Sequence, residues 1–236
     1  MTILITGASR GIGAELAIQL AREPHRLLLV ARNEKNLTAV CEKCNTIAGK
    51  KTAIPLIRDL NGILNDPSEF ERMIGDHTDT LDVLVNNAGM IIKKPFEELK
   101  REETRQIFDT NYFVPEQLIN ICLPMLKASA SASIINVTTM GAVQGSKKFH
   151  GMSAYSASKG ALATLTECLA EEFKPLGIRV NALAFGAVQT EMFAEAFPGY
   201  TASTNPEEMG RFFKWFVLEG WKRFNGKMLQ VTESTP

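Results

Sequence analysis

Apolar runs of strand length alternate with longer helical patterns from one end of this 236-residue chain to the other. The predicted strands are 2–6, 26–31, 52–58, 81–86, 133–138, 179–184 and 227–231. Most of them are continuously apolar, which is typical of strands covered on both faces. The predicted helices are 12–22, 33–48, 67–75, 102–128, 153–174 and 206–222. Because no linker or repeat interrupts the alternation, we predict one α/β domain over 1–236, a doubly wound, seven-stranded parallel sheet with helices on both faces.

Local signals refine these boundaries. Residues with N-cap chemistry precede three of the predicted helices, namely Asn33, Asp66 and Asn205. Pro115 and Pro124 interrupt the 102–128 pattern, and they either kink that helix or mark its first turn. The long segment 189–205 has no clear place in the sheet. A long connection at the carboxyl end of a parallel sheet usually forms a lid or a substrate wall, so 189–205 is the predicted lid.

A glycine-rich turn, Gly7-Ala8-Ser9-Arg10-Gly11-Ile12-Gly13, joins the first predicted strand to the first helix. Gly7 can turn tightly without a Cβ penalty, and Gly11 lets the backbone approach a pyrophosphate. Gly13 lets the helix pack close to the sheet, and the N-terminus of that helix presents N–H groups to an anion. The same glycines could form only a tight turn, but their position between strand and helix favours nucleotide binding.

Composition excludes several classes of function. Lys plus Arg and Asp plus Glu both number 26, so the formal net charge is zero, which gives no electrostatic argument for nucleic-acid or membrane binding. No apolar run reaches the ~20 residues of a membrane span. The first strand begins at residue 2, which leaves no room for a signal peptide, so we expect a cytoplasmic protein.

Cys41 and Cys44 have helical spacing and no partner pair, so we expect packed thiols and no metal site.

Tyr155 and Lys159 stand four residues apart in the predicted helix 153–174, so both side chains lie on one face. An ammonium group near a phenol favours the phenolate and is expected to lower the pKa of Tyr155 from its ordinary ~10. The pair is therefore a candidate general acid for carbonyl reduction, or general base for the reverse reaction. Because this spacing also arises by chance, it needs support from other segments.

That support comes from polar segments near the ends of predicted strands. Thr138 and Thr139 end one strand just before the Tyr155 helix. Segment 86–89, Asn-Asn-Ala-Gly, ends another strand, where its small residues permit close approach of a ligand. Asn111 lies in the long predicted helix, where its amide can hold backbone or water. We expect these segments to converge on the crevice where doubly wound sheets bind ligands.

In their order along the chain, these motifs resemble those of the classical short-chain dehydrogenase/reductase family over essentially the whole length. The matching marks are Thr6-Gly7-x-x-x-Gly11-x-Gly13, Asn86-Asn87-Ala88-Gly89, Asn111, a strand-end hydroxyl and Tyr155-x-x-x-Lys159. The resemblance implies a Rossmann-type fold and an oxidoreductase in which Tyr155 is the proton donor. It further implies that Lys159 binds the nicotinamide ribose, that Asn111 holds a water relaying protons to Lys159, and that Asp59 contacts the adenine ring.

Two positions depart from the family pattern. The family usually has serine at the strand end that orients the substrate carbonyl, and alignment puts Thr139 there. Thr138 is the alternative, because the register is uncertain by one residue. Threonine keeps the hydroxyl donor and adds a methyl group that narrows the pocket. Phe185 replaces the usual proline before a glycine, whereas Val188 and Thr190 still match positions that touch the nicotinamide carboxamide.

The choice of nicotinamide cofactor follows from the end of the second strand. A site for NAD needs an acid there, to accept from the ribose 2′-hydroxyl. This strand ends Val30-Ala31-Arg32-Asn33, and Arg32 together with Arg10 could hold a 2′-phosphate, although both could be ordinary surface arginines. NADP(H) is the predicted cofactor. Its predicted binding residues are Gly7, Ser9, Arg10, Gly11, Ile12, Gly13, Arg32, Asn33, Asp59, Leu60, Asn87, Ala88, Gly89, Tyr155, Lys159, Gly186, Val188 and Thr190.

The predicted function is NADP(H)-dependent reduction of a ketone or aldehyde, with Tyr155, Lys159, Thr139 and Asn111 as catalytic residues. Apolar residues in and near the lid suggest a medium-sized apolar substrate, or simply pack the lid; they are Phe149, Met152, Met192, Phe193, Phe197 and Tyr200. A 3-oxoacyl thioester is possible, but no basic patch for an acidic carrier protein is evident. The alternative is a sensor that binds NADP(H) without chemistry, although such a protein would not need the intact Asn–Tyr–Lys set.

The expected partners are a small-molecule substrate and further copies of the chain. The resemblance implies a homodimer or homotetramer in which helices 102–128 and 153–174 form a two-fold contact. Small and apolar residues on more than one face of 153–174 would allow such an approach. Aromatic residues in 206–222 could pack on the sheet or on a second subunit, and the tail 231–236 lacks the glycines found in many family members.

Overall fold

A computed structural model of the chain describes residues 1–232. Its strands are β1 (Thr2–Thr6), β2 (Arg26–Ala31), β3 (Ala53–Ile57), β4 (Val83–Asn86), β5 (Ser133–Thr139), β6 (Arg179–Phe185) and β7 (Met228–Val231). They form one sheet in the order β3-β2-β1-β4-β5-β6-β7, and every neighbouring pair is parallel. The predicted seven-stranded parallel sheet is therefore confirmed.

Eight α-helices connect these strands within residues 1–232. They are α1 (Gly11–Leu20), α2 (Glu34–Ala48), α3 (Pro67–Gly75), α4 (Arg101–Phe108), α5 (Val114–Lys127), α6 (Ser153–Glu172), α7 (Glu191–Ala196) and α8 (Pro206–Leu218). The three expected N-caps are present, since the side chains of Asn33, Asp66 and Asn205 accept hydrogen bonds from the first turns of α2, α3 and α8.

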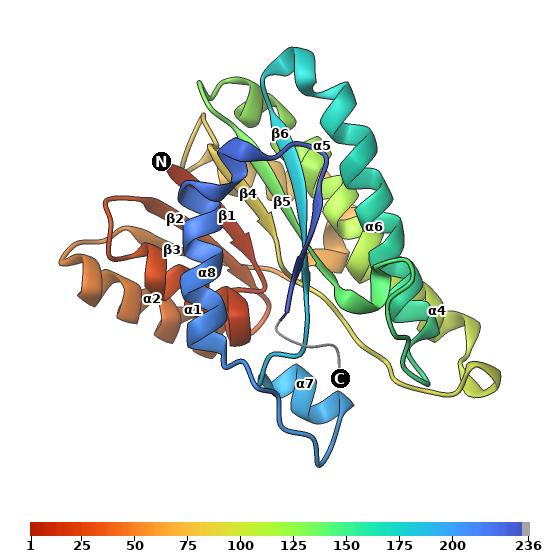
Figure 1. The fold of residues 1–236 in the computed structure, drawn as a ribbon. Coiled ribbons are helices and arrows are strands. Elements are labelled where there is room, and N and C mark those ends of the chain that lie inside the picture. Colours follow the sequence, from red (N-terminus) through yellow and green to blue (C-terminus); the bar gives the residue numbers. More distant parts are fainter. Residues whose placement is uncertain (233–236) are drawn as a thin grey trace.

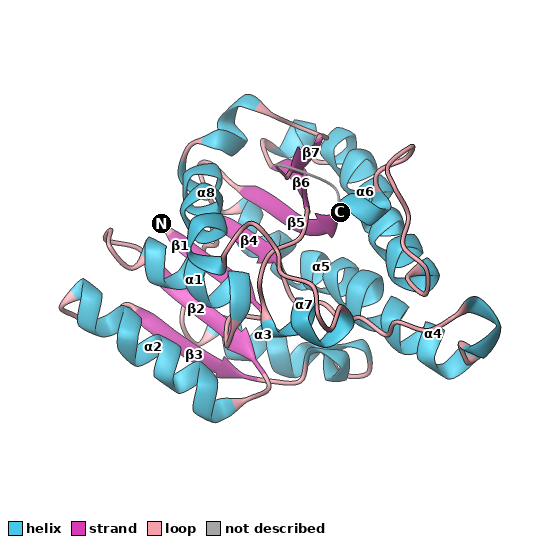
Figure 2. Ribbon diagram, turned by 60° about the horizontal axis from the view of Figure 1, so that its bottom comes forward, coloured by secondary structure: helices cyan, strands magenta, loops and turns pink. Residues whose placement is uncertain are grey.

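The helices cover the sheet on both faces (Figures 1 and 2). On one face α1, α2 and α8 bury side chains such as Leu16, Leu37 and Phe213 against the strands. On the other, α3, α5 and α6 contribute residues such as Phe70 and Leu118 to a second core cluster. Both faces of the central strands are therefore dry, which explains their continuous apolar sequences.

The long helix predicted over 102–128 is not continuous. It is divided into α4 and α5 by a π-helical turn, Asp109–Phe113. Pro115 lies in the first turn of α5, where a missing N–H is tolerated, and Pro124 lies inside that helix. The predicted lid, 189–205, contains the short helix α7.

The order of strands sets the position of the site. The chain winds outward from β1 to β3 and then crosses to β4 on the other side of β1, so β1 and β4 flank the point where the winding reverses. Ligands of doubly wound sheets bind outside the carboxyl ends of strands at such a point. The helix α7 lies beyond this end of the sheet (Figure 1).

Three of the four thiols are packed in the core, as expected. Cys41, Cys44 and Cys122 are buried, whereas Cys168 is exposed on α6. Burial raises the pKa of the Cys41 thiol to about 11 and that of Cys44 and Cys122 to about 12. No helix in the described part of the chain is both long and apolar enough to span a bilayer. The unusual tail lies largely outside the described residues, beyond residue 232.

Candidate active site

The glycine loop after β1 has the geometry that its sequence predicts. Gly7 and Gly11 adopt φ values of 66° and 58°, which disfavour a side chain. A Cβ atom on Gly7 would lie 2.9 Å from the Ala88 Cα, and one on Gly13 would lie 2.5 Å from both the Gly7 carbonyl oxygen and the Asn87 Nδ2. The backbone therefore forms a close-packed turn that opens onto the N-terminus of α1, as an anion-binding loop requires.

Asn87 and Thr6 lock this loop to the end of β4. The Thr6 hydroxyl oxygen accepts from the backbone N–H groups of Asn87 and Ala88, both at 3.0 Å. Asn87 Nδ2 donates to the carbonyl oxygens of Thr6 and Gly7, at 2.9 Å and 3.3 Å. The ends of β1 and β4, 81 residues apart in sequence, thus form one rigid unit.

Polar side chains predicted to hold the far end of the cofactor lie around this loop. Arg10 forms an ion pair with Glu195 of the lid at 3.5 Å. A cavity of about 680 Å³ lies beside the loop, lined by Ser9, Arg10, Gly11 and Asn36 among others. It does not include Arg32, which is exposed after β2.

Two other predicted cofactor contacts are already committed to local hydrogen bonds. Asn33 Oδ1 accepts from the backbone N–H of Asn36 at 2.9 Å, and Asp59 Oδ1 accepts from that of Asn61 at 3.1 Å. These bonds hold the loops after β2 and β3 in place at the carboxyl edge of the sheet. Leu60, predicted beside Asp59, is buried.

Tyr155 and Lys159 project from the first two turns of α6. The Lys159 side chain is only 2% exposed, and its Nζ donates to the Val137 carbonyl oxygen of β5 at 2.9 Å. Burial lowers the pKa of Lys159 to about 8. A Cβ on Gly89 would lie 3.4 Å from this Nζ, so the glycine ending the β4 segment leaves room beside the ammonium group.

The predicted lowering of the Tyr155 pKa is wrong for this structure. Desolvation raises the pKa of the half-buried Tyr155 to about 12, and a hydrogen bond with the Thr139 side chain only partly opposes that rise. Lys159 does not offset this rise of the Tyr155 pKa, because its Nζ donates to the Val137 carbonyl oxygen and not to the phenol. The phenol therefore keeps its proton at neutral pH, the form that a proton donor needs.

Asn111 lies in the π-helical turn between α4 and α5 and is fully buried. Its Oδ1 accepts from the Met90 backbone N–H at 2.8 Å, and its Nδ2 donates to the Met90 carbonyl oxygen at 2.9 Å and to Ser158 Oγ at 3.1 Å. Ser158 Oγ donates in turn to the Tyr155 carbonyl oxygen at 2.8 Å. Asn111 therefore connects the segment after β4 with the first turns of α6. Such π-helical turns are frequent at functional sites.

The two threonines at the end of β5 differ in what they face. Thr139 hydrogen bonds with the Tyr155 side chain, and its Oγ1 also accepts from the Gly141 N–H at 3.3 Å. Thr138 Oγ1 is buried and has no hydrogen-bond partner in the described part of the chain. Consecutive strand residues point to opposite faces of the sheet, so only one of the two hydroxyl groups can face Tyr155. In the structure that residue is Thr139.

A buried polar chain attaches α6 to the sheet below these residues. Asn86 Nδ2 donates to Asn136 Oδ1 at 2.8 Å, and Asn136 Nδ2 donates to Thr166 Oγ1 at 2.9 Å. The chain joins β4, β5 and α6, the three elements that carry the polar residues described above. It therefore holds the Tyr155 helix in register with the strand ends.

The segment after β6 begins the lid. Phe185, in place of proline, is buried and packs edge-to-face on Phe213 at 5.4 Å between ring centroids, so it belongs to the core. The Gly186 N–H donates to the Val231 carbonyl oxygen at 3.0 Å. Thr190 caps α7, and its methyl carbon lies 3.3 Å from where a Cβ of Gly11 would stand.

The lid aromatics pack mainly on one another. Phe193 stacks on Phe197 at 5.2 Å, and Phe197 contacts Phe149 at 5.9 Å and Tyr200 at 6.5 Å between ring centroids. Phe197 therefore joins the lid to the segment before α6. Tyr200 remains 67% exposed at the outer end of this cluster.

Sequence reasoning missed three contacts in this region. Ser158 links Asn111 to α6, the Thr6 hydroxyl holds the β4 segment, and Glu195 pairs with Arg10. Ser158 lies inside the Tyr-x-x-x-Lys segment and Thr6 ends β1, so the positions of both residues in the sequence could have indicated a role in the site. Nothing in the sequence brings Glu195 to Arg10, because only the path of the lid does so.

Comparison with protein-family models finds one match over most of the chain. The model for short chain dehydrogenase matches residues 1–201. The part of the chain beyond residue 201 includes α8 and β7, which complete one core cluster and the edge of the sheet.

Curated proteins and solved structures show the same similarity. Ketoacyl reductase HetN of Nostoc sp. is 32% identical over 193 residues, which cover 81% of this chain and 65% of that protein. A fatty acyl-CoA reductase of Acinetobacter baylyi is 29% identical over 97% of this chain and 78% of that protein. A short chain dehydrogenase of Escherichia coli, solved with NADPH, has a TM-score of 0.89 and 28% identity over 97% of this chain and 95% of that one.

Proposed function

This chain belongs to the short chain dehydrogenase family, and from that premise we propose that it is an NADP(H)-dependent carbonyl reductase whose proton donor is Tyr155. The observation that carries the proposal is the meeting of Tyr155, Lys159, Thr139 and Asn111 at the carboxyl edge of the sheet. Burying an ammonium group lowers the stability of the folded protein, so packing of the core alone would not require a lysine at position 159.

The residues suit a nicotinamide cofactor. Gly7 and Gly13 let the glycine loop pack closely on Asn87 and Ala88. The loop leads into the N-terminus of α1, whose N–H groups would bind a pyrophosphate. Gly89 has no side chain to fill the space beside the Lys159 Nζ, the group that would hold the ribose. When bound, the cofactor supplies or accepts the hydride.

The side chains of the site supply the rest of the chemistry. Thr139 and Tyr155 bind and orient the substrate carbonyl oxygen, and Tyr155 donates its hydroxyl proton to that oxygen as reduction proceeds. Lys159, whose Nζ is held by the Val137 carbonyl oxygen, would hold the ribose of the nicotinamide beside Tyr155. Asn111 holds the segment after β4 and the start of α6 at a fixed distance, which keeps these groups aligned.

A screen of ketones, aldehydes and 3-oxoacyl thioesters, followed by NADPH absorbance, tests the activity. The relatives named as ketoacyl and fatty acyl-CoA reductases favour including acyl thioesters. Turnover of at least one carbonyl compound is expected. NADPH binding without turnover of any compound would instead support a sensor.

We predict that NADPH binds more tightly than NADH by roughly ten- to a hundredfold, because a charge-assisted contact with a 2′-phosphate contributes ~1.5–3 kcal/mol. Arg10 and Arg32 supply that contact, and Glu195 competes for Arg10 in the structure. Calorimetric titration of both cofactors measures the preference. Arg10→Ala with Arg32→Ala should abolish it, and Arg72→Ala, in the distant helix α3, is the matched control. Equal affinities, or a preference that survives the double substitution, would contradict the assignment.

We further propose that the chain assembles as a dimer or tetramer through α5 and α6. Phe113, which directly precedes α5, is 44% exposed, and Leu165 on α6 is only half-buried. A second pair of the same helices would cover these side chains. Light scattering at micromolar concentration should give at least twice the monomer mass, and a mass near 26.0 kDa would contradict the proposal.

A further inference from the structure

Two lysine pairs, 54 residues apart in sequence, meet at the outer rim of the lid. Lys93-Lys94 follows β4 and Lys147-Lys148 precedes α6. The Lys94 backbone N–H donates to the Gly151 carbonyl oxygen at 3.0 Å, so the two segments lie against each other. A cavity of about 340 Å³ opens there, lined by Lys93, Lys94, His150 and the end of the lid helix. The basic patch that the sequence does not reveal is therefore present in the fold.

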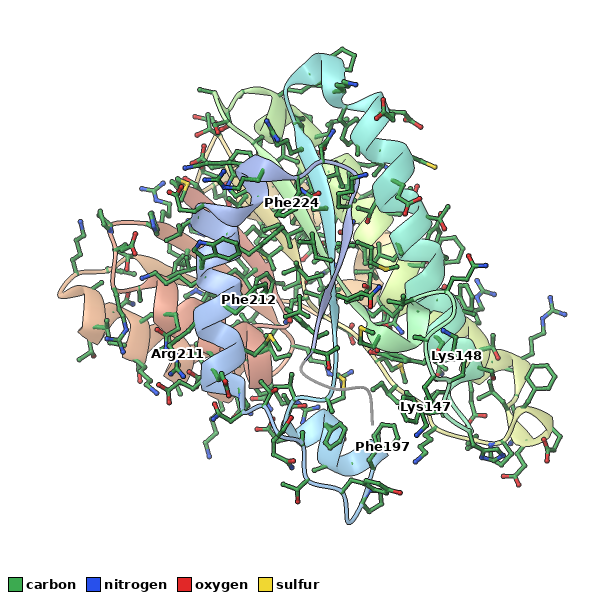
Figure 3. The ribbon with its side chains drawn as sticks, viewed as in Figure 1. Lys147, Lys148, Phe197, Arg211, Phe212 and Phe224 are labelled. Atoms are coloured by element: carbon green, nitrogen blue, oxygen red, sulfur yellow. The ribbon has the colours of Figure 1, made fainter. Side chains whose placement is uncertain are left out.

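The lysine amines surround an aromatic pair of the lid. Lys93 Nζ lies 4.1 Å from the centre of the Phe197 ring, and Lys147 Nζ lies 5.8 Å from that of Phe149. Because these two rings contact each other at 5.9 Å, both ammonium groups flank one apolar junction. Figure 3 shows Lys147, Lys148 and Phe197 at the same end of the molecule.

Little negative charge opposes these amines. Glu103 pairs with Lys94. Glu195 lines the same cavity, and its carboxylate pairs with Arg10 at 3.5 Å. Lys93 donates to the Ala196 carbonyl oxygen at 3.0 Å and Lys148 to that of Val143 at 2.5 Å, so both bond neutral acceptors. No ion pair within residues 1–232 joins Lys93, Lys147 or Lys148 to a carboxylate.

We propose that this lysine rim binds an oxyanion, phosphate or carboxylate, carried by the carbonyl substrate at the end away from the carbonyl. The inference deepens the proposed reductase function, since it assigns the substrate class as an amphipathic carbonyl compound. Its apolar part would lie along the lid aromatics and its anion would meet the ammonium groups. Exposed charges steer and hold such a ligand, and their effect weakens with salt.

Matched substrates test the inference. Acetoacetyl coenzyme A is compared with its uncharged N-acetylcysteamine thioester, and 4-oxopentanoate with its methyl ester. We expect kcat/KM to favour at least one charged member, through KM and less so at high salt. Lys93→Glu with Lys147→Glu should lower kcat/KM for that member roughly tenfold and leave its neutral partner unchanged. Lys51→Glu, exposed before β3 at the opposite edge of the sheet, is the control.

A binding measurement separates this inference from the reductase proposal. Calorimetry of the same charged compounds with protein saturated in NADP⁺, which cannot reduce them, should show binding that the double variant weakens and Lys51→Glu does not. Lysine-dependent binding of acetoacetyl coenzyme A would identify phosphate as the bound anion, and lysine-dependent binding of 4-oxopentanoate would identify carboxylate. If neither charged compound binds in a lysine-dependent way, or if neutral and charged members lose affinity equally, the rim is not an anion site. Failure of turnover alone would overturn only the reductase proposal.

Discussion

Tyr155→Phe should lower kcat by ~10²–10⁴-fold and leave the affinity for the cofactor nearly unchanged. The substitution deletes only the hydroxyl group that donates the proton. The phenylalanine ring keeps the volume and the contacts of the tyrosine ring. Thr139 loses one partner but still accepts from the Gly141 N–H. The measurement is kcat and KM on a carbonyl substrate found by screening, together with calorimetric binding of NADPH.

Tyr112→Phe provides the control for loss of a phenol. Its ring packs on that of Phe113 outside the candidate site, at 5.1 Å between centroids, so the control should keep its activity. Thr139→Val should also reduce turnover more than Thr138→Val, because only Thr139 bonds Tyr155. A Tyr155→Phe enzyme that works at nearly the wild-type rate would refute the assigned mechanism.

Lys159→Met should raise the free energy of unfolding and lower turnover. Holding the pKa of Lys159 at about 8 instead of 10.5 corresponds to about 3–4 kcal/mol of destabilisation at neutral pH, at ~1.4 kcal/mol per pKa unit. Methionine removes that cost but also the hydrogen bond to Val137, which contributes ~1 kcal/mol. We therefore expect the variant to be about 2–3 kcal/mol more stable at neutral pH. Turnover should fall by roughly 10²-fold or more.

The stability difference should depend on pH with a defined sign. Between pH 8 and pH 10.5 the unfolded chain holds a proton on Lys159 that the folded protein does not. Wild-type stability therefore gains from this residue as pH rises through that window, and the advantage of the variant disappears above it. The buried thiols of Cys41, Cys44 and Cys122 titrate in the opposite sense, but they cancel in the difference between the two proteins.

Urea unfolding of both proteins across this pH range measures the effect. A variant that is less stable than wild type at neutral pH would show that burying the Lys159 ammonium group does not destabilise the folded protein. A stability difference that does not change with pH would show the same. A stability cost is expected where a residue is kept for function and not for folding.

The parts of the fold set by periodicity were predictable from sequence. All seven strands lie within two residues of their predicted bounds, because most of them are covered on both faces and are continuously apolar. Caps at Asn33, Asp66 and Asn205 were predictable because their chemistry is local. Tyr155 and Lys159 were predictable as a pair because helical spacing alone brings them together.

Features that depend on contacts distant in sequence were not predictable in this way. Asn111, in the π-helical turn, makes two hydrogen bonds to Met90, 21 residues away, which no periodicity encodes. The direction of the Tyr155 pKa shift depends on burial, and burial outweighs the neighbouring charge that spacing suggested. The lysine rim depends on two loops meeting across the carboxyl edge of the sheet.

The interlock of the glycine loop with Asn87 also constrains how this protein can vary. The side chain of Asn87 occupies the space that a Cβ on Gly7 or Gly13 would need, and it bonds the loop carbonyls while doing so. Backbone atoms crowd the same space, since a Cβ on Gly7 would lie 2.9 Å from the Ala88 Cα and one on Gly13 would lie 2.5 Å from the Gly7 carbonyl oxygen. Neither glycine can therefore accept a side chain, whatever residue stands at position 87. An engineered change of nucleotide preference is therefore better directed to Arg10 and Arg32, whose side chains take no part in these contacts.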